Sequence, residues 1–306
     1  MSNRYLGGFI SATYNPLLVP NEPTIGTASA VSATSLSIAF TAPSNVGGSA
    51  ITSYTAIAKR TSDGVLFTAS GASSPITVTG LTSVPFTVTV VAVNSYGPSA
   101  SSVASNSVTP VQPIGSAFGG GFYAGQISTA GNGIADYNLV VGPVSSAQNT
   151  SKQWKTGNSG GDPTSVIDGP NNSATMNSAT YPAAQFCEAV NVGGFTDWYM
   201  PALNELEVCY YNLKPTTTSN NGATSGVNAN AVPARASNYT AGTPAQTSAT
   251  DFKDTGAEDY GTPYYWASTQ GSSTQGWAQT FSDGNQSYYY TKTSSKSVRA
   301  IRRVAV

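Results

Sequence analysis

The sequence predicts a mainly β protein with a short N-terminal segment, a β-sandwich and a larger α+β domain. Three observations point to this fold class. Residues 21–110 contain short runs of alternating polar and apolar residues, separated by Gly, Pro, Asn and Ser clusters. From residue 118 onward, similar runs are mixed with two stretches of helical spacing. With 306 residues, the chain is long enough for two or three domains with separate cores.

The composition indicates an ordered chain and excludes several classes of function. Only 9% of the residues are charged, but 17 Tyr, 10 Phe and 4 Trp provide enough apolar area for a core. The net charge is −1, and the basic residues cluster only at the C-terminus, which argues against nucleic-acid binding. There is no histidine, so Ser-His-Asp and Cys-His catalysis are excluded.

The chain shows no sign of a membrane span or of a secretory signal. It has no run of about 18 apolar residues, the length that a transmembrane helix requires. Its N-terminus lacks a basic region followed by an apolar stretch. The composition is nevertheless typical of an extracellular protein, so we expect release by another route, such as host lysis.

Cys187 and Cys209 are the only cysteines. They are compatible with a disulfide or with two separate buried thiols, and sequence alone does not decide between these.

Residues 1–20 form an apolar and aromatic segment that is too short to be a domain. One interpretation is an unstructured terminus. We favour an anchor that docks into a neighbouring subunit, because its large apolar side chains would otherwise face water. The proposed anchor residues are Tyr5, Phe9, Ile10, Tyr14 and Leu17.

The region 21–110 predicts a β-sandwich of roughly seven short strands. Alternation is clearest in residues 35–40, 51–58 and 86–93. Together with Val78-Thr79-Gly80-Leu81-Thr82 and the run from Val91 to Ser99, these strands resemble the fibronectin type III family. Phe40 lies near the usual core tryptophan, and Phe86 replaces a tyrosine whose hydroxyl is worth roughly 1 kcal/mol. The resemblance implies a spacer without chemistry of its own.

After a Pro-bearing linker at residues 110–117, the texture of the sequence changes. Residues 137–141 predict a strand, a long polar loop follows residues 153–156, and residues 179–191 have helical spacing. A second helix, from 204 to 213, has one apolar face. Residues 214–250 predict a long surface loop, and the alternating stretches around the Asp283-Gly284 turn predict a hairpin-like ending. The apolar helix face consists of Leu206, Cys209, Tyr210 and Leu213.

A series of motifs in residues 118–306 resembles the Lcl C-terminal domain family, also called the Fib_succ_major type. The motifs are Phe186-Cys187, Gly193-Gly194-Phe195-Thr196-Asp197-Trp198, Met200-Pro201, Asn204-Glu205-Leu206, Tyr265-Trp266-Ala267-Ser268-Thr269, Trp277 with Phe281-Ser282-Asp283-Gly284, and Val298-Arg299-Ala300-Ile301-Arg302-Arg303. Their order and spacing match the family. The resemblance implies a fold of the C-type-lectin-like and sulfatase-modifying-factor kind.

These motif residues have ordinary structural explanations. Gly193-Gly194 suits a turn with positive φ, and Pro201 suits the first turn of a helix. Asp197 would be a buried charge, so we expect it to pair with backbone amides or with Arg299 or Arg302. Because no base accompanies them, we predict a folding signature and no catalytic residue, metal or cofactor. The signature comprises Gly193, Gly194, Asp197, Trp198, Pro201, Glu205, Trp266, Trp277, Arg299 and Arg302.

The resemblance also implies that the segment after the Tyr265-Trp266 strand, residues 270–275 and 285–292, faces outward. Tyr, Ser, Asn and Gln are typical of adaptable binding surfaces. Three successive tyrosines should alternate between the two faces of a strand, so one or two should be exposed. The alternative is a solvated hairpin with incidental tyrosines. The candidate ligand-binding residues are Gln270, Ser272, Ser273, Gln275, Asn285, Gln286, Tyr288, Tyr289 and Tyr290.

Three functions are compatible with these features. The favoured one is a bacteriophage virion surface protein (capsid decoration, tail fibre or appendage), bound to other virion proteins through its N-terminus and displaying a head that binds a host glycan or receptor. The opening MSNRYLGGFISATYNPL also resembles the start of marine bacteriophage structural proteins. The second is a freestanding carbohydrate-binding adhesin, which would need export. The third is a sulfatase-modifying type of enzyme, which would need reactive cysteines or a metal. We expect a homo-oligomer and take a trimer as the first guess, by analogy with fibres.

Overall fold

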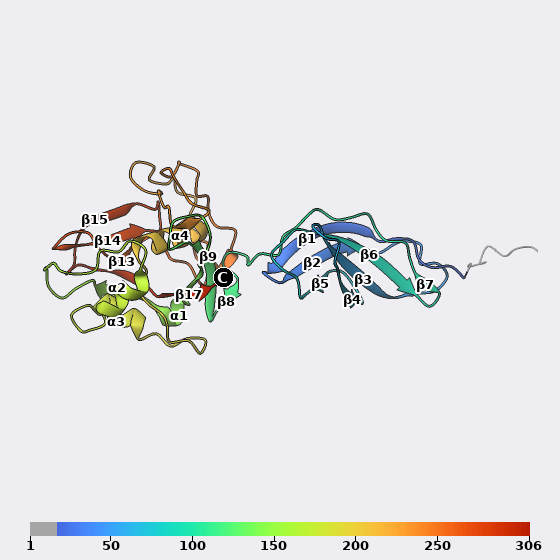
Figure 1. The fold of residues 1–306 in the computed structure, drawn as a ribbon, viewed down its shortest axis with the longest axis horizontal. Coiled ribbons are helices and arrows are strands. Elements are labelled where there is room, and N and C mark those ends of the chain that lie inside the picture. Colours follow the sequence, from blue (N-terminus) through green and yellow to red (C-terminus); the bar gives the residue numbers. More distant parts are fainter. Residues whose placement is uncertain (1–16) are drawn as a thin grey trace, which may run out of the picture. The chain divides into compact units, whose positions relative to one another are not determined.

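The structure is a computed structural model, and it describes residues 17–306. The chain forms two compact units that divide between Pro113 and Ile114 (Figure 1). Among the proposed anchor residues, Leu17 is described and exposed. The other four lie outside the described residues, so the anchor stays a prediction: Tyr5, Phe9, Ile10 and Tyr14.

The first unit is a sandwich of two antiparallel sheets, with strand orders β1-β2-β5 and β4-β3-β6-β7. Along β6 every second residue is buried, as expected for a strand that faces a core on one side. Phe40 packs against Tyr54 with ring centroids 4.8 Å apart, and Phe86 is fully buried, so both departures from the fibronectin pattern keep an aromatic core. The strands are β1 (Thr24–Ser32), β2 (Ser35–Thr41), β3 (Ile51–Arg60), β4 (Leu66–Gly71), β5 (Ile76–Val78), β6 (Phe86–Asn94) and β7 (Gly97–Pro98).

The second unit contains two five-stranded sheets, with orders β12-β9-β10-β17, where β8 also pairs with β9, and β11-β16-β13-β14-β15. The first sheet consists of β8 (Ala117–Phe118), β9 (Gly121–Ile127), β10 (Tyr137–Val141), β12 (Ala231–Val232) and β17 (Ile301–Ala305). The second consists of β11 (Gln148–Gln153), β13 (Tyr264–Gln270), β14 (Gln275–Thr280), β15 (Gln286–Thr291) and β16 (Ser295–Arg299). The helices are α1 (Val144–Ala147), α2 (Gly169–Thr175), α3 (Pro182–Glu188), α4 (Leu203–Leu213) and the 3-10 turn η1 (Thr250–Phe252). The predicted mainly β fold class, with an α+β second part, is confirmed.

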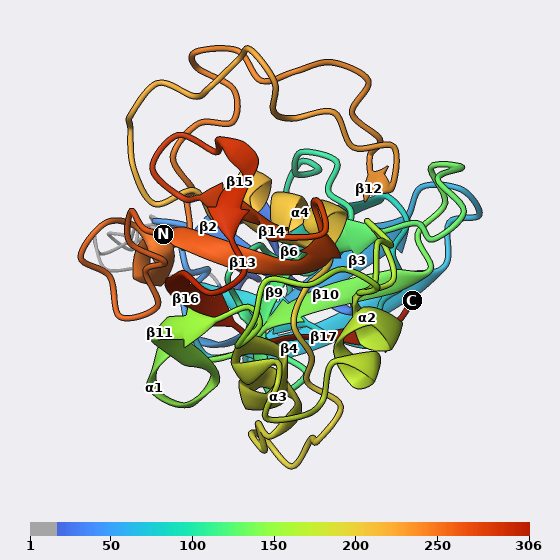
Figure 2. The same ribbon diagram turned by 90° about the vertical axis from the view of Figure 1, so that its left-hand side faces the viewer.

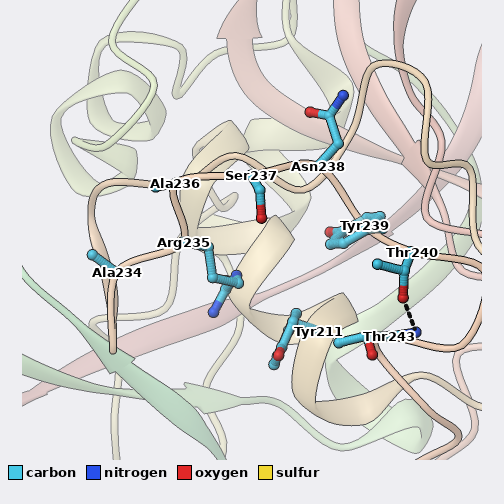
Figure 3. Close-up of a pocket in the computed structure, with 9 residues that line it drawn as sticks. All are labelled: Tyr211, Ala234, Arg235, Ala236, Ser237, Asn238, Tyr239, Thr240 and Thr243. Atoms are coloured by element: carbon cyan, nitrogen blue, oxygen red, sulfur yellow. Dashed lines mark hydrogen bonds between the residues drawn. The ribbon is translucent and has the colours of Figure 1, made fainter.

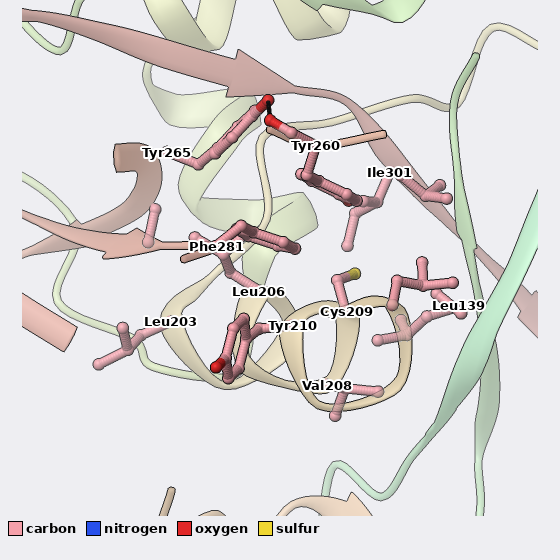
Figure 4. Close-up of a cluster of buried hydrophobic side chains, with 14 of the residues drawn as sticks. Leu139, Leu203, Leu206, Val208, Cys209, Tyr210, Tyr260, Tyr265, Phe281 and Ile301 are labelled. Carbon is pink, nitrogen blue, oxygen red and sulfur yellow. Dashed lines mark hydrogen bonds between the residues drawn. The ribbon is translucent and has the colours of Figure 1, made fainter. Parts of the chain in front are cut away.

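Helix α4 lies at the centre of the second unit and contacts both sheets (Figure 2). All four residues of its predicted apolar face are buried, and they pack with rings from β13 and from the loop after β14 (Figure 4). Tyr260 and Phe281 stack in this cluster, with ring centroids 3.8 Å apart. The two carboxylates of the helix are also fully buried, Glu205 against Tyr199 and Arg303 and Glu207 against residues of the loop 214–250.

Three features differ from the sequence-based expectations. The partner of β14 in the hairpin is β15, whereas the closing stretch forms two strands in different sheets, β16 and β17, on either side of Ala300. Helix α2 lies inside a segment that reads as a polar loop, because its Gly, Pro, Asn and Ser residues carry no apolar period. Pro201 precedes the N-cap of α4, Ala202, and is not in its first turn.

Candidate functional site

The Gly193-Gly194 turn packs closely against a second glycine turn. Both glycines have positive φ, 65° and 80°. A Cβ on Gly193 would lie 2.4 Å from the Cα of Gly120, so a larger residue would force the two turns apart. The turn therefore requires glycine for both its conformation and its packing.

Asp197 pairs with Arg302, one of the two arginines expected for it. Arg302 donates from Nε and Nη2 to the two carboxylate oxygens at 2.7 and 2.8 Å. These hydrogen bonds hold the pKa of Asp197 below its ordinary value. The expectation of a buried charge was wrong, because the Asp197 side chain is 56% exposed at the edge of the pair. Arg299 pairs instead with Glu258, donating to Oε2 at 2.6 Å.

Most of the remaining signature residues are part of the core. Trp198 and Trp266 are fully buried. Glu205 accepts hydrogen bonds from the backbone N of Ala202 at 2.8 Å and from Nε of Arg303 at 2.8 Å. The same carboxylate therefore caps the N-terminus of α4 and neutralises the charge of Arg303 near the C-terminus. These contacts fit the predicted folding role. Trp277 is the exception, because it is only half-buried.

The β14–β15 hairpin brings Trp277 together with two of the candidate tyrosines. Gly276 pairs with Tyr290 and Ala278 pairs with Ser287, so the register slips by one residue between them. This β-bulge places Tyr288 and Tyr289 opposite Trp277 and interrupts the alternation of faces that the sequence predicts. Tyr288 lies 4.8 Å from the Trp277 ring and 5.1 Å from the Tyr289 ring, between centroids.

Tyr288 and Tyr289 are exposed, at 38% and 75%. We refer to Trp277, Tyr288 and Tyr289 as the aromatic surface. Tyr290 is not part of it, because its ring packs between Tyr264 and Trp266 and the ammonium of Lys296 lies over it at 3.8 Å.

The polar candidate residues divide between the two ends of the hairpin. Ser272 donates to Oε1 of Gln275 at 2.9 Å, next to exposed Ser273. At the other end, Asn285 donates to the hydroxyl of Tyr264 at 3.0 Å, and the backbone N of Gln286 donates to Ser225. The structure therefore does not gather all the candidates into one site.

Gln270 belongs to an internal cluster, because its Oε1 accepts from Nζ of Lys292 at 2.8 Å. Lys292 was expected on the outward-facing segment, but it is fully buried and also donates to Asp162 at 2.6 Å. Lys155 and Tyr181 donate to the other oxygen of Asp162 at 2.7 and 2.6 Å. Burial raises the pKa of Asp162, but hydrogen bonds from its three partners outweigh burial and leave it below the ordinary value. No sequence pattern signals this cluster, whose partners come from four separate segments.

Cys187 and Cys209 are free, fully buried thiols in different core clusters. Burial raises the pKa of both thiols, that of Cys209 to about 12. Within residues 17–306 there is no group of three or more potential metal-ligating side chains. None of the helices in the same residues is long and apolar enough to cross a bilayer.

The sequence also gave no sign of a surface pocket of about 300 Å³ between α4 and the loop 214–250 (Figure 3). The walls combine an aromatic residue of α4 with polar residues, two alanines and a tyrosine of the loop. The lining residues are Tyr211, Ala234, Arg235, Ala236, Ser237, Asn238, Tyr239, Thr240 and Thr243.

The protein is modular. A fibronectin type III-like sandwich is followed by an α+β domain with its own internal ion pairs. Residues 145–302, a little over half of the chain, match the Lcl C-terminal domain. The chain belongs to this family, which confirms the resemblance of its motifs.

Three of the solved structures that are similar to this chain each cover about a third of it. A crystal structure of titin domains is 27% identical, with a TM-score of 0.29, over 31% of this chain and 33% of that chain. Titin kinase with its flanking domains is 27% identical, with a TM-score of 0.28, over 30% of this chain and 17% of that chain. The FN5 domain of Drosophila Lar is 22% identical, with a TM-score of 0.26, over 30% of this chain and 98% of that chain. No curated protein matches the chain.

Proposed function

We propose that this protein is a non-enzymatic component of a bacteriophage virion surface, whose second unit is a C-type-lectin-like head that binds a host-surface glycan or receptor. The fibronectin type III-like unit serves as a spacer, and residues 1–20 bind neighbouring virion proteins. The family membership of the second unit, the absence of histidine and the apolar N-terminal sequence support this proposal.

The aromatic surface is the observation that carries the proposal. Three large rings lie together on one hairpin, and the outermost, Tyr289, leaves most of its area in water. Exposed clusters of this kind usually have a binding partner. Tyrosine and tryptophan supply contact area at low entropic cost, because each side chain has only two rotatable χ angles. The flat faces and the tyrosine hydroxyls suit a sugar ring or a protein loop equally.

The state of the cysteines supports a binding role over the enzyme alternative. The nucleophilic form of cysteine is the thiolate. Because Cys187 and Cys209 are buried and their thiol pKa values are raised, both are protonated at neutral pH. Neither thiol is therefore prepared for the chemistry of a sulfatase-modifying enzyme.

The binding role is tested with the double variant Tyr288→Ser, Tyr289→Ser. We expect binding of the labelled full chain to host bacteria to fall by tenfold or more, since each buried aromatic anchor contributes at least about 1 kcal/mol. Tyr96→Ser is the matched control, because Tyr96 is an exposed tyrosine of the first unit, at 45%. Unchanged binding by the double variant would refute a role for the aromatic surface.

The virion location is tested separately by electron microscopy of phage particles labelled with gold-conjugated antibodies against this protein. Regular labelling of capsids, tails or fibres is the expected result. Labelling of bacterial surfaces without any on particles would refute the virion role and favour the freestanding adhesin.

A further inference from the structure

The loop 214–250 has almost no regular secondary structure, yet its positions are held by buried polar contacts. Its only strand is β12, two residues long. Loops of this length without regular structure are uncommon in compact domains unless they serve a function. In Figure 2 the loop, in gold and orange, extends over α4 and β15.

One carboxylate holds three points of the loop. Glu207 of α4 is fully buried and accepts hydrogen bonds from Nδ2 of Asn228 at 2.6 Å and from the hydroxyl of Tyr239 at 2.8 Å. Arg235 also donates to it, from Nε at 3.2 Å and from Nη2. The arginine is fixed further because its guanidinium lies 4.1 Å from the ring centroid of Tyr211.

A second buried group fixes the far side of the loop. Asn220 donates through Nδ2 to the carbonyls of Thr240 and Pro244 at 3.0 and 2.8 Å. Its Oδ1 accepts from Tyr210 at 2.5 Å and from Lys214 at 2.7 Å. The 300 Å³ surface pocket is thus lined by segments that are already ordered, so a ligand would not have to order them.

The lining of the pocket is electrically balanced and rich in hydrogen-bonding groups. Glu207 neutralises the charge of Arg235, so the site has no excess positive charge to attract an anion. The hydroxyls of Ser237 and Thr243 make no hydrogen bond within residues 17–306. Asn238 uses its Nδ2 to bond the carbonyl of Ala223, which leaves its Oδ1 as an acceptor. In Figure 3 the Ser237 hydroxyl points toward Arg235 and Thr243 lies beside Tyr211, whereas the Asn238 amide lies at the outer edge of the group.

We propose that this pocket binds one neutral sugar ring of a glycan. Its volume is at the small end of the range for ligand pockets, about 300–1,000 Å³, and so suits a single ring rather than a drug-sized molecule. The unpaired hydroxyls and the amide oxygen match the alternating donors and acceptors of sugar hydroxyls. Arg235 covers the near face of Tyr211, so a flat aromatic ligand could not stack there. The pocket and the aromatic surface share no residue, and the proposal does not depend on the virion role.

Saturation-transfer NMR of the full chain with free glucose, galactose, mannose and N-acetylglucosamine tests the proposal. N-acetylneuraminic acid serves as the anionic comparison. We expect saturation transfer to at least one neutral sugar with a millimolar dissociation constant. This constant corresponds to a binding free energy of roughly 4 kcal/mol or less in magnitude. No transfer to any of the four neutral sugars, or transfer to the anionic sugar alone, would overturn the proposal.

The variant Ala236→Trp tests whether the sugar binds in the pocket. Ala236 lines the pocket and is exposed, and its side chain makes no polar contact, so a large ring there fills the space without breaking the Glu207 contacts. We expect at least tenfold weaker sugar binding. Ala245→Trp is the control, because Ala245 is an exposed alanine of the same loop outside the pocket.

Two outcomes separate this proposal from the function proposed above. Saturation transfer that persists in Ala236→Trp would overturn assignment to this pocket. Loss of transfer in the Tyr288→Ser, Tyr289→Ser variant would assign sugar binding to the aromatic surface instead. If the pocket is correct, the tyrosine variant keeps its sugar signal even when its binding to bacteria is lost.

Discussion

Buried carboxylates in the second unit lie against cations from distant parts of the chain. Glu205 meets Arg303, Glu207 meets Arg235, and Asp162 meets Lys155 and Lys292. An unpaired buried charge is costly, so each of these contacts joins segments that must be placed correctly before the charge is neutralised. Only 9% of the residues are charged, and a large share of these charges lies in the interior.

The Asp162 cluster predicts a specific response to acid. The folded pKa of Asp162 lies below that of the unfolded chain, so its contribution to stability is complete above the unfolded pKa, about 4. This contribution is lost as the pH falls through the lower, folded pKa. In Asp162→Asn two lysines lose their counter-charge, and we expect the free energy of unfolding at pH 7 to fall by about 3–5 kcal/mol.

Urea unfolding followed by tryptophan fluorescence at pH 7 and pH 3 measures this effect, because all four tryptophans lie in the second unit. The difference between wild type and Asp162→Asn should shrink in acid. The control is Asp254→Asn, since the exposed Asp254 side chain has no hydrogen bond in the described part of the chain. An equal difference at both pH values would contradict the prediction.

At the residue scale, sequence reasoning succeeded where a motif linked two residues. Arg302 was among the partners expected for Asp197, together with Arg299 and backbone amides, because the family pattern closes with arginines. The burial of Glu205 and Glu207 was not foreseen. Helical periodicity assigns them to the polar side, and that side is buried only because Arg303 of β17 covers Glu205 and the loop 214–250 covers Glu207. Lys292 was expected to face outward but is buried, and its partners were not predictable because they are distant in sequence.

Among the elements, the segment after β7 shows how serine spacing completes a sheet edge. Ser99, Ser102 and Ser105 donate their backbone N–H groups to carbonyls of β6, at 2.8, 2.9 and 2.9 Å. Their hydroxyls accept the N–H groups of Ala92, Val90 and Val88, each at 3.0 Å. The serines recur every three residues, whereas their partners in β6 recur every two. Serine hydroxyls accept the N–H groups of β6 that backbone carbonyls would accept in a regular β-ladder. The edge of β6 is covered without a regular strand.

We expect Ser102→Ala to destabilise the first unit by about 1–3 kcal/mol, because the buried N–H of Val90 would lose its acceptor. Calorimetry should show a lower melting transition for that unit, while tryptophan fluorescence, which reports on the other unit, stays unchanged. Ser101→Ala is the matched control, since the neighbouring Ser101 is exposed. Equal stability of the two variants would show that the hydroxyl contacts add nothing.

Elements with strong periodicity were predicted well, and irregular elements were not. β6 and α4 follow from the alternation and helical spacing of their own residues. The bulge in β15 has no local signal, because it depends on how β15 registers with β14. That bulge creates the aromatic surface, so the composition of the candidate site was predictable but its geometry was not.

On the scale of the whole molecule, the two units have separate cores. The sandwich core and the two clusters of the second unit share no residue. The order of the parts was predictable from the sequence, because the pattern of residues changes near the linker. Strand-like alternation precedes the linker, and strand-like and helical stretches are mixed after it. The role of residues 1–20 could be inferred only from their apolar character, so it needs a direct test.

The test depends on where the truncation ends. The backbone of Leu18 donates to the carbonyl of Gly47 and accepts from Asn94, both at 2.9 Å, so the sandwich holds the last residues of the proposed anchor in place. Deleting residues 2–16 removes most of the proposed anchor and should leave the thermal unfolding of the chain unchanged. We expect incorporation into phage particles, measured by quantitative mass spectrometry of purified virions, to fall at least tenfold.

The control for this deletion is Val103→Ser, which removes an apolar side chain that is 75% exposed on the first unit. Because an anchor acts through a specific contact, loss of general surface hydrophobicity at Val103 should not alter incorporation. Wild-type incorporation of the deleted chain would show that residues 2–16 are not the anchor. Equal losses in both variants would indicate that assembly responds to surface hydrophobicity as a whole, and the attachment would then have to involve the folded units themselves.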